Sequence, residues 1–232
     1  MSLRTRVRSL FPGAVPAALT EIALIFVGIT LAISFENWNS ERAERESEQA
    51  SLRELRSDLV DNIEELKADL AFDSLTLVGF DTILLHLEAR LPYTDDLAAT
   101  FAYLENWESP YLTISAYETL KTRGLDLVTD AALRAEIVRL FENVYRKLIE
   151  DYDRSEWINF EVSMYPLMLS HIEERPGSVA EPIDYEALMD DRPFRIALLR
   201  SASLRTGGVS LKEEAIRSTQ IVINMIDMSL RN

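Results

Sequence analysis

The two histidines of this sequence are the side chains best suited to metal or acid–base chemistry near neutral pH. A di-iron helical bundle needs paired Glu-x-x-His motifs, but Ile83 and Met168 occupy the glutamate positions ahead of His86 and His171. His171 with Glu174 matches a fragment of a metal site, and a surface ion pair is the preferred interpretation. His86 lies in an apolar stretch, which predicts a hydrogen-bonded histidine in or beside the core.

Carboxylates gather in the stretch that follows residue 60, where their oxygens could bind calcium weakly. Acids interleaved with leucines on a helix are more typical of a solvated face, and this is the interpretation we adopt. The acids are Asp61, Glu64, Glu65, Asp69 and Asp73.

Other catalytic signatures are missing from the sequence. It has no cysteine, which excludes disulfides, thiolate nucleophiles and cysteine metal ligands. It has no phosphate-binding glycine loop, nucleophile elbow, HExxH motif or EF-hand loop. The sequence therefore predicts a protein that is not an enzyme, with no catalytic residues, no cofactor and no metal site.

Aromatic side chains recur beyond residue 110. We expect them to fill the core between helices, which is the usual role of such side chains, and lining a ligand pocket is the alternative. They are Tyr111, Tyr117, Tyr145, Tyr152, Trp157 and Phe160.

The composition narrows the class of protein. A net charge of −15 and a pI near 4.6 argue against nucleic-acid binding, which needs clustered lysines and arginines. With 232 residues, 47% of them hydrophobic, the chain can bury a core. Its 7 glycines are few for the turns of a β-rich fold. We expect an all-α protein of one domain with an appendage, or of two small domains.

A near-continuous apolar run predicts a transmembrane helix over residues 14–36. Glu21 is its only charge before Phe35, and a run of about 20 residues suffices to cross a bilayer. A secretory signal is the alternative, because Ala32 and Ser34 are spaced like a cleavage site. The length of the run and its acid favour a retained anchor. A buried core helix is the third alternative, disfavoured because little else in the chain is apolar enough to surround it.

The charges around the span predict its orientation. Basic residues precede it and acids follow it, and basic residues favour the cytoplasmic side, although Arg42 and Arg45 lie near the far end. We therefore predict a bacterial inner-membrane protein with a short cytoplasmic tail, residues 1–13, and an acidic periplasmic helical domain, residues 37–232. The basic flank consists of Arg4, Arg6 and Arg8.

Small residues within the span predict contacts with other membrane helices. Gly28 and Ala32 form a small-xxx-small pair, and Thr30 and Ser34 offer hydroxyls on a neighbouring face. The general abundance of small residues in membrane helices is the alternative explanation. Glu21, near the cytoplasmic end, would extend to the interface or pair with an arginine. The predicted anchors at the other interface are Trp38, Asn37 and Asn39.

Helical periodicity continues far beyond the apolar run. Residues 30–78 contain no glycine or proline, and apolar residues recur every three or four positions. This pattern predicts a long amphipathic helix that ends before Pro92. Shorter helices are expected over residues 94–107, with a capping threonine or aspartate, and over residues 115–124, which end at Gly124.

A second long helix is predicted over residues 129–177, capped by a threonine or aspartate and kinked or split at Pro166. After a stretch that is mostly loop, residues 193–230 are expected to form two helices separated by Gly207 and Gly208. Together these helices predict an antiparallel helical bundle.

Residues 21–46 resemble the N-terminal signature of a family of uncharacterised bacterial single-pass membrane proteins. In that family Glu-Ile opens the span, Gly-Ile-x-x-Ala follows, and Asn-Trp-Asn closes it before a long charged helix; Glu36 departs from the usual asparagine. Residues 116–134 are similar to a second family segment, Tyr-x-x-Leu-Lys followed by Gly and a Leu-Arg pair. The resemblance implies a retained anchor rather than a signal peptide. It suggests no particular activity, since the family is a domain of unknown function. The matching residues are Glu21, Ile22, Gly28, Ile29, Ala32, Asn37, Trp38 and Asn39.

These features predict a non-enzymatic anchor or accessory subunit. It would lie in the lipid bilayer, pack with other membrane helices as a homo-oligomer or in a larger complex, and scaffold partners in the periplasm. The alternative is an extracytoplasmic ligand-sensing module, which would signal through a partner because residues 1–13 are too short for an output domain. No nucleic-acid partner is expected.

Overall fold

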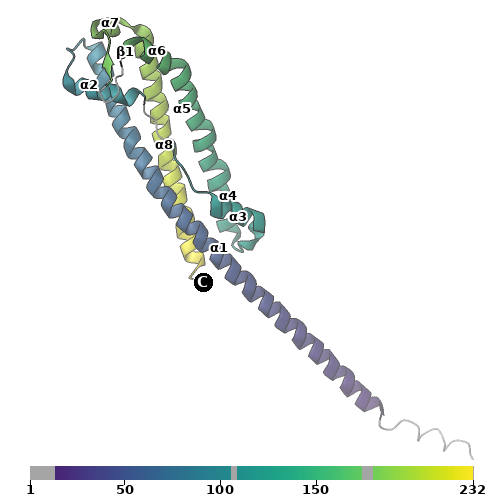
Figure 1. Ribbon diagram of the computed structural model, residues 1–232. Coiled ribbons are helices and arrows are strands. Elements are labelled where there is room, and N and C mark those ends of the chain that lie inside the picture. Colours follow the sequence, from purple (N-terminus) through teal and green to yellow (C-terminus); the bar gives the residue numbers. More distant parts are fainter. Residues whose placement is uncertain (1–13, 106–108, 174–179, 232) are drawn as a thin grey trace, which may run out of the picture. The chain divides into compact units, whose positions relative to one another are not determined.

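The structure, a computed structural model, describes residues 14–105, 109–173 and 180–231. The chain divides into two units, Met1–Ala50 and Ser51–Asn232, which we describe separately. The described residues are almost entirely helical, which confirms the all-α fold (Figure 1).

The described part of the first unit is the beginning of a single helix, α1 (Ala14–Glu88). The side chains of residues 21–46 are exposed, because the described part of this unit offers no second element for them to pack on. By length and composition, α1 is the one helix among the described residues that contains a segment able to cross a membrane. Residues 14–36, for which a transmembrane helix is predicted, are helical in the structure. The same helix continues without a break into the predicted amphipathic segment.

Three long helical runs build the second unit (Figure 1). They are residues 51–88 of α1, the run from α4 (Ala131–Arg139) to α6 (Tyr165–His171), and α8 (Arg192–Ser229). Side chains of α8 bond to both of the other runs, and higher residue numbers on those runs meet lower numbers on α8. The helix α8 is thus antiparallel to its two neighbours.

The run from α4 to α6 alternates between α-helical and π-helical segments. Pro166 lies in the first turn of α6, directly after a π-helical segment, so the helix changes its type where a kink or split was expected. The run ends at His171 rather than near residue 177, because the chain then enters a short strand. Its inner segments are η3 (Leu140–Tyr145), η4 (Lys147–Asp153), α5 (Arg154–Asn159) and η5 (Phe160–Met164).

Short elements connect the long runs. A two-residue antiparallel strand pair, which sequence periodicity did not predict, joins Ile172 to Pro182 and Glu173 to Glu181. The helix expected over residues 94–107 is shorter and ends with a 3₁₀ turn. The elements are α2 (Asp95–Phe101), η1 (Ala102–Leu104), α3 (Ser115–Arg123), η2 (Leu125–Leu127), β1 (Ile172–Glu173), β2 (Glu181–Pro182) and α7 (Tyr185–Asp190).

Local capping explains where several of these helices begin and end. The Thr94 side chain accepts a hydrogen bond from the backbone N–H of Leu97, and Asp130 caps α4 in the same manner. Gly124 ends α3 with a φ of 109°, a backbone conformation that favours glycine. The predicted caps and the stop at Gly124 are confirmed.

The helix α8 is continuous through Gly207 and Gly208, so the expected separation into two helices is wrong. Each glycine costs a helix about 1 kcal/mol relative to alanine. Buried residues of α8 before Gly207 and after Gly208 offset this cost. Asp191 also caps the first turn of α8, since its side chain accepts a hydrogen bond from the N–H of Phe194.

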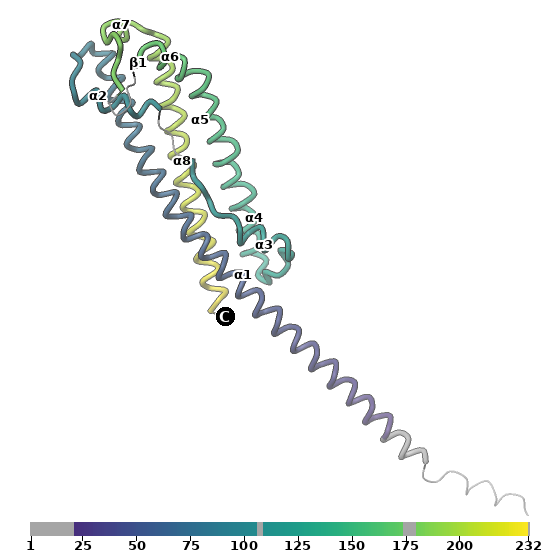
Figure 2. The backbone as a smooth tube through the Cα atoms, in the orientation of Figure 1, coloured from purple at the N-terminus to yellow at the C-terminus, as the bar shows by residue number. Residues whose placement is uncertain are grey.

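The chain returns along the bundle between α2 and α3 (Figure 2), and polar side chains of α1 bind this segment. Asn62 exchanges two hydrogen bonds with the backbone of Thr113, at 2.9 and 2.7 Å. Asp58 accepts from the N–H of Ala116 at 2.9 Å and from the hydroxyl of Ser115 at 3.1 Å. A carboxylate from α1 therefore caps α3, whose own N-cap residue, Ile114, makes no side-chain cap bond.

Two hydrophobic cores fill the second unit, and buried polar residues lie between them along α1, α5 and α8. The first core includes Leu55, Leu59, Leu66, Leu133, Ile137, Tyr145, Val222 and Ile226. The second includes Phe80, Ile83, Leu87, Phe101, Met164, Leu188, Phe194 and Leu198.

Candidate functional site

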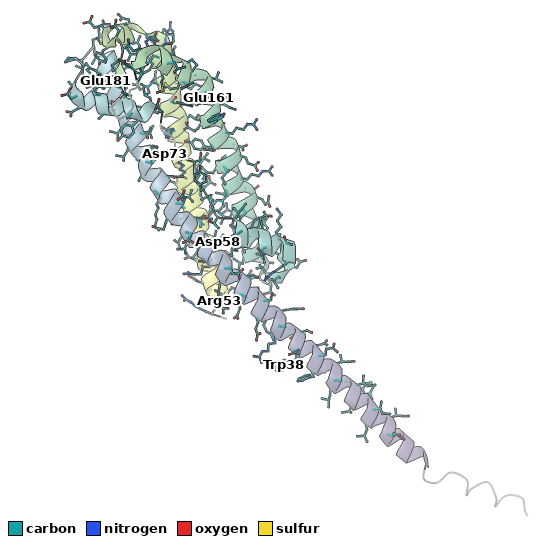
Figure 3. The ribbon with its side chains drawn as sticks, in the orientation of Figure 1. Trp38, Arg53, Asp58, Asp73, Glu161 and Glu181 are labelled. Carbon is teal, nitrogen blue, oxygen red and sulfur yellow. The ribbon has the colours of Figure 1, made fainter. Side chains whose placement is uncertain are left out.

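An ion network crosses the interior of the second unit between the two cores. The Arg205 guanidinium lies between two carboxylates, with Nη1 3.2 Å from Asp73 Oδ1 and Nε 3.1 Å from Glu156 Oε1. All three side chains are buried. Figure 3 shows Asp73 on the part of α1 that belongs to the bundle. A charge in such a place is costly unless it is paired, and here each helix supplies one partner.

Lys212, seven residues further along α8, extends the network by about two helical turns. Its Nζ lies 2.9 Å from Asp73 Oδ2 and 3.8 Å from Asp69 Oδ2, and the lysine side chain is completely buried. We call these five groups, Asp69, Asp73, Glu156, Arg205 and Lys212, the charged layer. It joins three carboxylates to two cations.

The expectation of a solvated acidic face is therefore wrong for Asp69 and Asp73. It holds for Asp61, which is exposed, and for Glu64, whose carboxylate pairs with Lys67 at the surface. Glu65 accepts a hydrogen bond from the N–H of Tyr111. Within the described residues, no group of three or more His, Asp or Glu side chains has the arrangement of a metal site.

Tyr152 of η4 contacts both the charged layer and the backbone of α8. Its hydroxyl donates to Glu156 Oε1 at 2.6 Å. Burial raises the pKa of Tyr152 above its ordinary value, and the Glu156 carboxylate raises it further, so the phenol stays a neutral donor. A Cβ atom on Gly208 would overlap the Tyr152 ring. This glycine is therefore required where the tyrosine crosses α8.

Burial lowers the pKa of Arg205, but Glu156 and Asp73 outweigh that effect and leave the pKa raised. The guanidinium is thus charged at any physiological pH, and its role here is to neutralise carboxylates that would otherwise be buried without compensation.

Asn159 stands beside the charged layer. Its Nδ2 donates to Ser201 Oγ at 2.8 Å, while its Oδ1 is buried and has no hydrogen-bond partner among the described residues. Asn159, Glu156, Ser201 and Arg205 border a cavity of about 10 Å³, a size that admits one water molecule at most.

An open groove of about 840 Å³ runs outside this layer, between residues 147–159 and α8. Tyr152 and Asn159 belong to its lining, so the same two side chains border the groove and contact the buried polar residues. π-Helical turns such as η4 are found in other proteins frequently at functional sites.

A second groove, of about 340 Å³, lies between α3 and η3. Tyr117 stacks on Phe141 with ring centroids 4.2 Å apart. Lys121 and Tyr117 both donate to Glu142 Oε1, and these hydrogen bonds hold the pKa of that carboxyl below its usual value. These contacts form a surface cluster centred on the Glu142 carboxylate, and Lys121 also lies 3.7 Å from Glu118 Oε1.

The aromatic residues expected to fill the core divide into two groups. Tyr117, Tyr145 and Tyr152 are buried, as predicted. Tyr111 is 84% exposed and Trp157 is 50% exposed, so the prediction is wrong for these two. Phe160 is partly buried against the second core.

His171 pairs with an acid, and His86 lies at the boundary of the core. His171 Nε2 lies 3.1 Å from Asp191 Oδ2, whereas Glu174 lies outside the described residues. His86 is half-buried, and its Nδ1 has no hydrogen-bond partner within the described part of the chain. The position of His86 beside the core agrees with the prediction, whereas its Nδ1 makes no hydrogen bond to the part of the chain that the structure describes.

The residues predicted to act in the membrane lie on the exposed first part of α1. A Cβ atom on Gly28 would meet nothing within 4 Å. Thr30 Oγ1 donates to the Phe26 carbonyl at 2.8 Å, and the rings of Phe35 and Trp38 are 6.0 Å apart. The other exposed members are Glu21, Ala32, Ser34, Asn37 and Asn39. The basic flank, Arg4, Arg6 and Arg8, lies outside the described residues.

The fold and its interior define the class as an all-α protein whose second unit holds buried charge between two cores. Comparison of the chain with family models, with curated proteins and with solved structures found no match.

Sequence reasoning did not single out Glu156, Arg205 or Lys212. One signal was present: on α8 the two cations are spaced by seven residues and continue the stripe of buried positions at Ala215, Val222 and Ile226. A cation inside an apolar stripe at helical spacing predicts a buried partner.

Proposed function

We propose that this protein is a non-enzymatic, membrane-anchored accessory subunit that packs with other membrane helices and scaffolds a larger inner-membrane assembly. One observation carries the proposal: the apolar side chains on the first part of α1 are exposed within their own unit. Phe26 is 70% exposed and Phe35 68%. An apolar surface of this kind, on a helix of sufficient length, is stable in lipid and unstable in water.

The polar groups of this segment also suit a lipid environment. Thr30 satisfies its hydroxyl within the helix, at the Phe26 carbonyl, so it leaves no unpaired donor in hydrocarbon. The open space beside Gly28, with Ala32 one turn away, allows a second helix to approach closely. Trp38 suits the headgroup region at the end of the segment.

The orientation in the proposal has the basic tail in the cytoplasm and the acidic helical unit in the bacterial periplasm. It rests on the distribution of arginines around the span and on the resemblance to the single-pass membrane family. Since the chain has no cysteine, a single introduced cysteine gives an unambiguous label. Ser9→Cys should be protected from a membrane-impermeant maleimide in intact cells, and Thr206→Cys should be labelled. The opposite pattern would reverse the orientation.

The assembly is tested by extracting the full chain in mild detergent and measuring the size and composition of the complex that co-purifies with it. We expect a complex of defined stoichiometry that Gly28→Leu dissociates. Ala23→Leu is the matched control, because at about 3.6 residues per turn it places the same leucine side chain on nearly the opposite face. A chain that extracts alone, or that responds equally to the two substitutions, would remove the support for an accessory subunit.

A ligand-sensing module that signals through a partner is the second candidate. The observation that favours it is the groove of about 840 Å³ bordered by Tyr152 and Asn159, within the size range of small-molecule sites.

A further inference from the structure

The groove beside η4 and α5 has two distinct ends. Asn159 bonds Ser201, and the ring of Tyr152 meets Gly208, so the antiparallel register puts Arg200 and Ser203 at the Asn159 end. Leu211 and Lys147 lie toward the other end. At 1.5 Å per residue, the span from 147 to 158 corresponds to roughly 15 Å. The space is therefore elongated.

Asn159 borders one end of the groove as well as the small interior cavity, and its side chain has an unsatisfied polar atom. Asn159 is 4% exposed, and its Oδ1 has no hydrogen-bond partner among the described residues, because Ser201 engages only Nδ2. Turning the amide over would let Ser201 donate to Oδ1 and would leave an N–H unpaired instead. In either orientation one buried polar atom lacks a partner, which is unfavourable for the folded chain. A ligand that supplies a polar atom would recover this cost.

The charges of the groove favour an anion. Lys147 and Arg200 are exposed and line it, and neither forms an ion pair with another described residue. In a chain of net charge −15, most lysines and arginines have acidic neighbours to pair with. Asp151 is the one acid that lines the groove within the described residues. The groove therefore has two cations without an ion pair and one acid among its described lining residues.

The rest of the lining is apolar or small. Leu204 and Leu211 form a wall on α8, and Ile158 lies opposite. Gly207 leaves open space between them, since a Cβ atom there would meet nothing within 4 Å. Hydroxyls of Ser155 and Ser203 complete the lining.

We propose that this groove binds a small amphiphilic anion, a monocarboxylate with an unbranched apolar chain. The carboxylate lies at Arg200, Ser203 and Asn159, where a guanidinium, a hydroxyl and the amide N–H can donate to it. The chain lies over Gly207 along Leu204 and Leu211. The inference depends on the groove alone and is independent of whether α1 is a membrane anchor.

The probe is octanoate, titrated calorimetrically into the full chain in lipid nanodiscs, with empty nanodiscs as the blank and octanol as the uncharged analogue. We expect saturable one-to-one binding of octanoate, and no such binding of octanol. Arg200→Gln should weaken it about tenfold or more, the loss expected for a hydrogen bond to a charged group. Arg192→Gln removes an exposed charge of α8 outside the groove and should leave the affinity unchanged.

A second variant separates binding from folding. Gly207→Leu fills the groove and should abolish octanoate binding, while it leaves the unfolding temperature equal or higher because leucine favours helix over glycine. Ser210→Leu adds the same side chain at an exposed position outside the groove and should bind like the parent chain. Three results would overturn the proposal. They are octanoate binding no greater than to empty nanodiscs, equal binding of octanol, and octanoate binding that neither Arg200→Gln nor Gly207→Leu changes.

Discussion

Arg205 on α8 and Glu156 on α5 face each other in the interior, with Nε 3.1 Å from Oε1 and both side chains at most 6% exposed. Asp73 of α1 approaches the same guanidinium at 3.2 Å. One cation thus joins the three long helical runs of the second unit at a single level.

Removing that cation should destabilise the bundle more than any surface substitution. Arg205→Met leaves Asp73 and Glu156 buried with less compensation, and the loss of one partner from a buried ion pair costs about 3–5 kcal/mol. The measurement is urea unfolding of the full chain in micelles, followed by circular dichroism. Arg217→Met, which breaks only an exposed pair with Glu213, should cost less than about 1 kcal/mol. Similar costs for the two variants would show that the charged layer is not a stabilising element.

The adjacent glycines of α8 should respond to alanine with opposite signs. Gly208→Ala forces a methyl group into the Tyr152 ring, and overpacking of this kind costs about 1–3 kcal/mol. Gly207→Ala places its methyl group in open space and should stabilise the helix by about 0.5–1 kcal/mol. The shift of the urea midpoint measures both. A Gly208→Ala chain as stable as Gly207→Ala would contradict the close approach of Tyr152.

The cap that α1 provides for α3 should be measurable. Asp58→Ala removes the acceptor of the Ala116 N–H and the Ser115 hydroxyl, a loss of about 1 kcal/mol for a capping side chain. Asp58→Asn keeps a neutral acceptor and should cost less. Asp61→Ala, at an exposed position of the same helix, is the control and should leave the unfolding midpoint almost unchanged. Hydrogen exchange of the Ala116 amide reports the same contact, and an unaltered exchange rate in Asp58→Ala would argue against it.

Alkaline pH should weaken the fold through Tyr145. Burial raises the pKa of Tyr145 from 10.0 to about 12, so the folded state holds the phenol proton more tightly than the unfolded state does. The associated stability is fully present below pH 10 and is lost as the pH rises toward about 12. Its full extent is roughly 3 kcal/mol at the usual 1.4 kcal/mol per pKa unit.

Tyr145→Phe tests this expectation. It should lower stability at neutral pH, because the hydroxyl bonds Thr219, but it should flatten the decline between pH 10 and about 12. Tyr111→Phe, at a position 84% exposed, should keep the parent slope. The free energy of unfolding measured against pH distinguishes the two, and an identical slope in Tyr145→Phe would refute the assignment.

The sequence by itself determined the features that depend on neighbours along the chain. Helical periodicity, the caps at Thr94 and Asp130 and the stop at Gly124 follow from local backbone and side-chain chemistry. The length and composition of the apolar segment in α1 also follow from the sequence alone, since neither depends on contacts with other parts of the chain.

Only the tertiary structure decided which polar residues are buried. Asp61 and Asp73 are both acids in the same helical pattern, yet one is exposed and the other pairs with Arg205 and Lys212, 132 and 139 residues away. The same applies to Gly208, whose value to the fold depends on Tyr152 crossing it. Such pairings depend on the register between helices that are distant in sequence, and the pattern within either helix carries no information about that register.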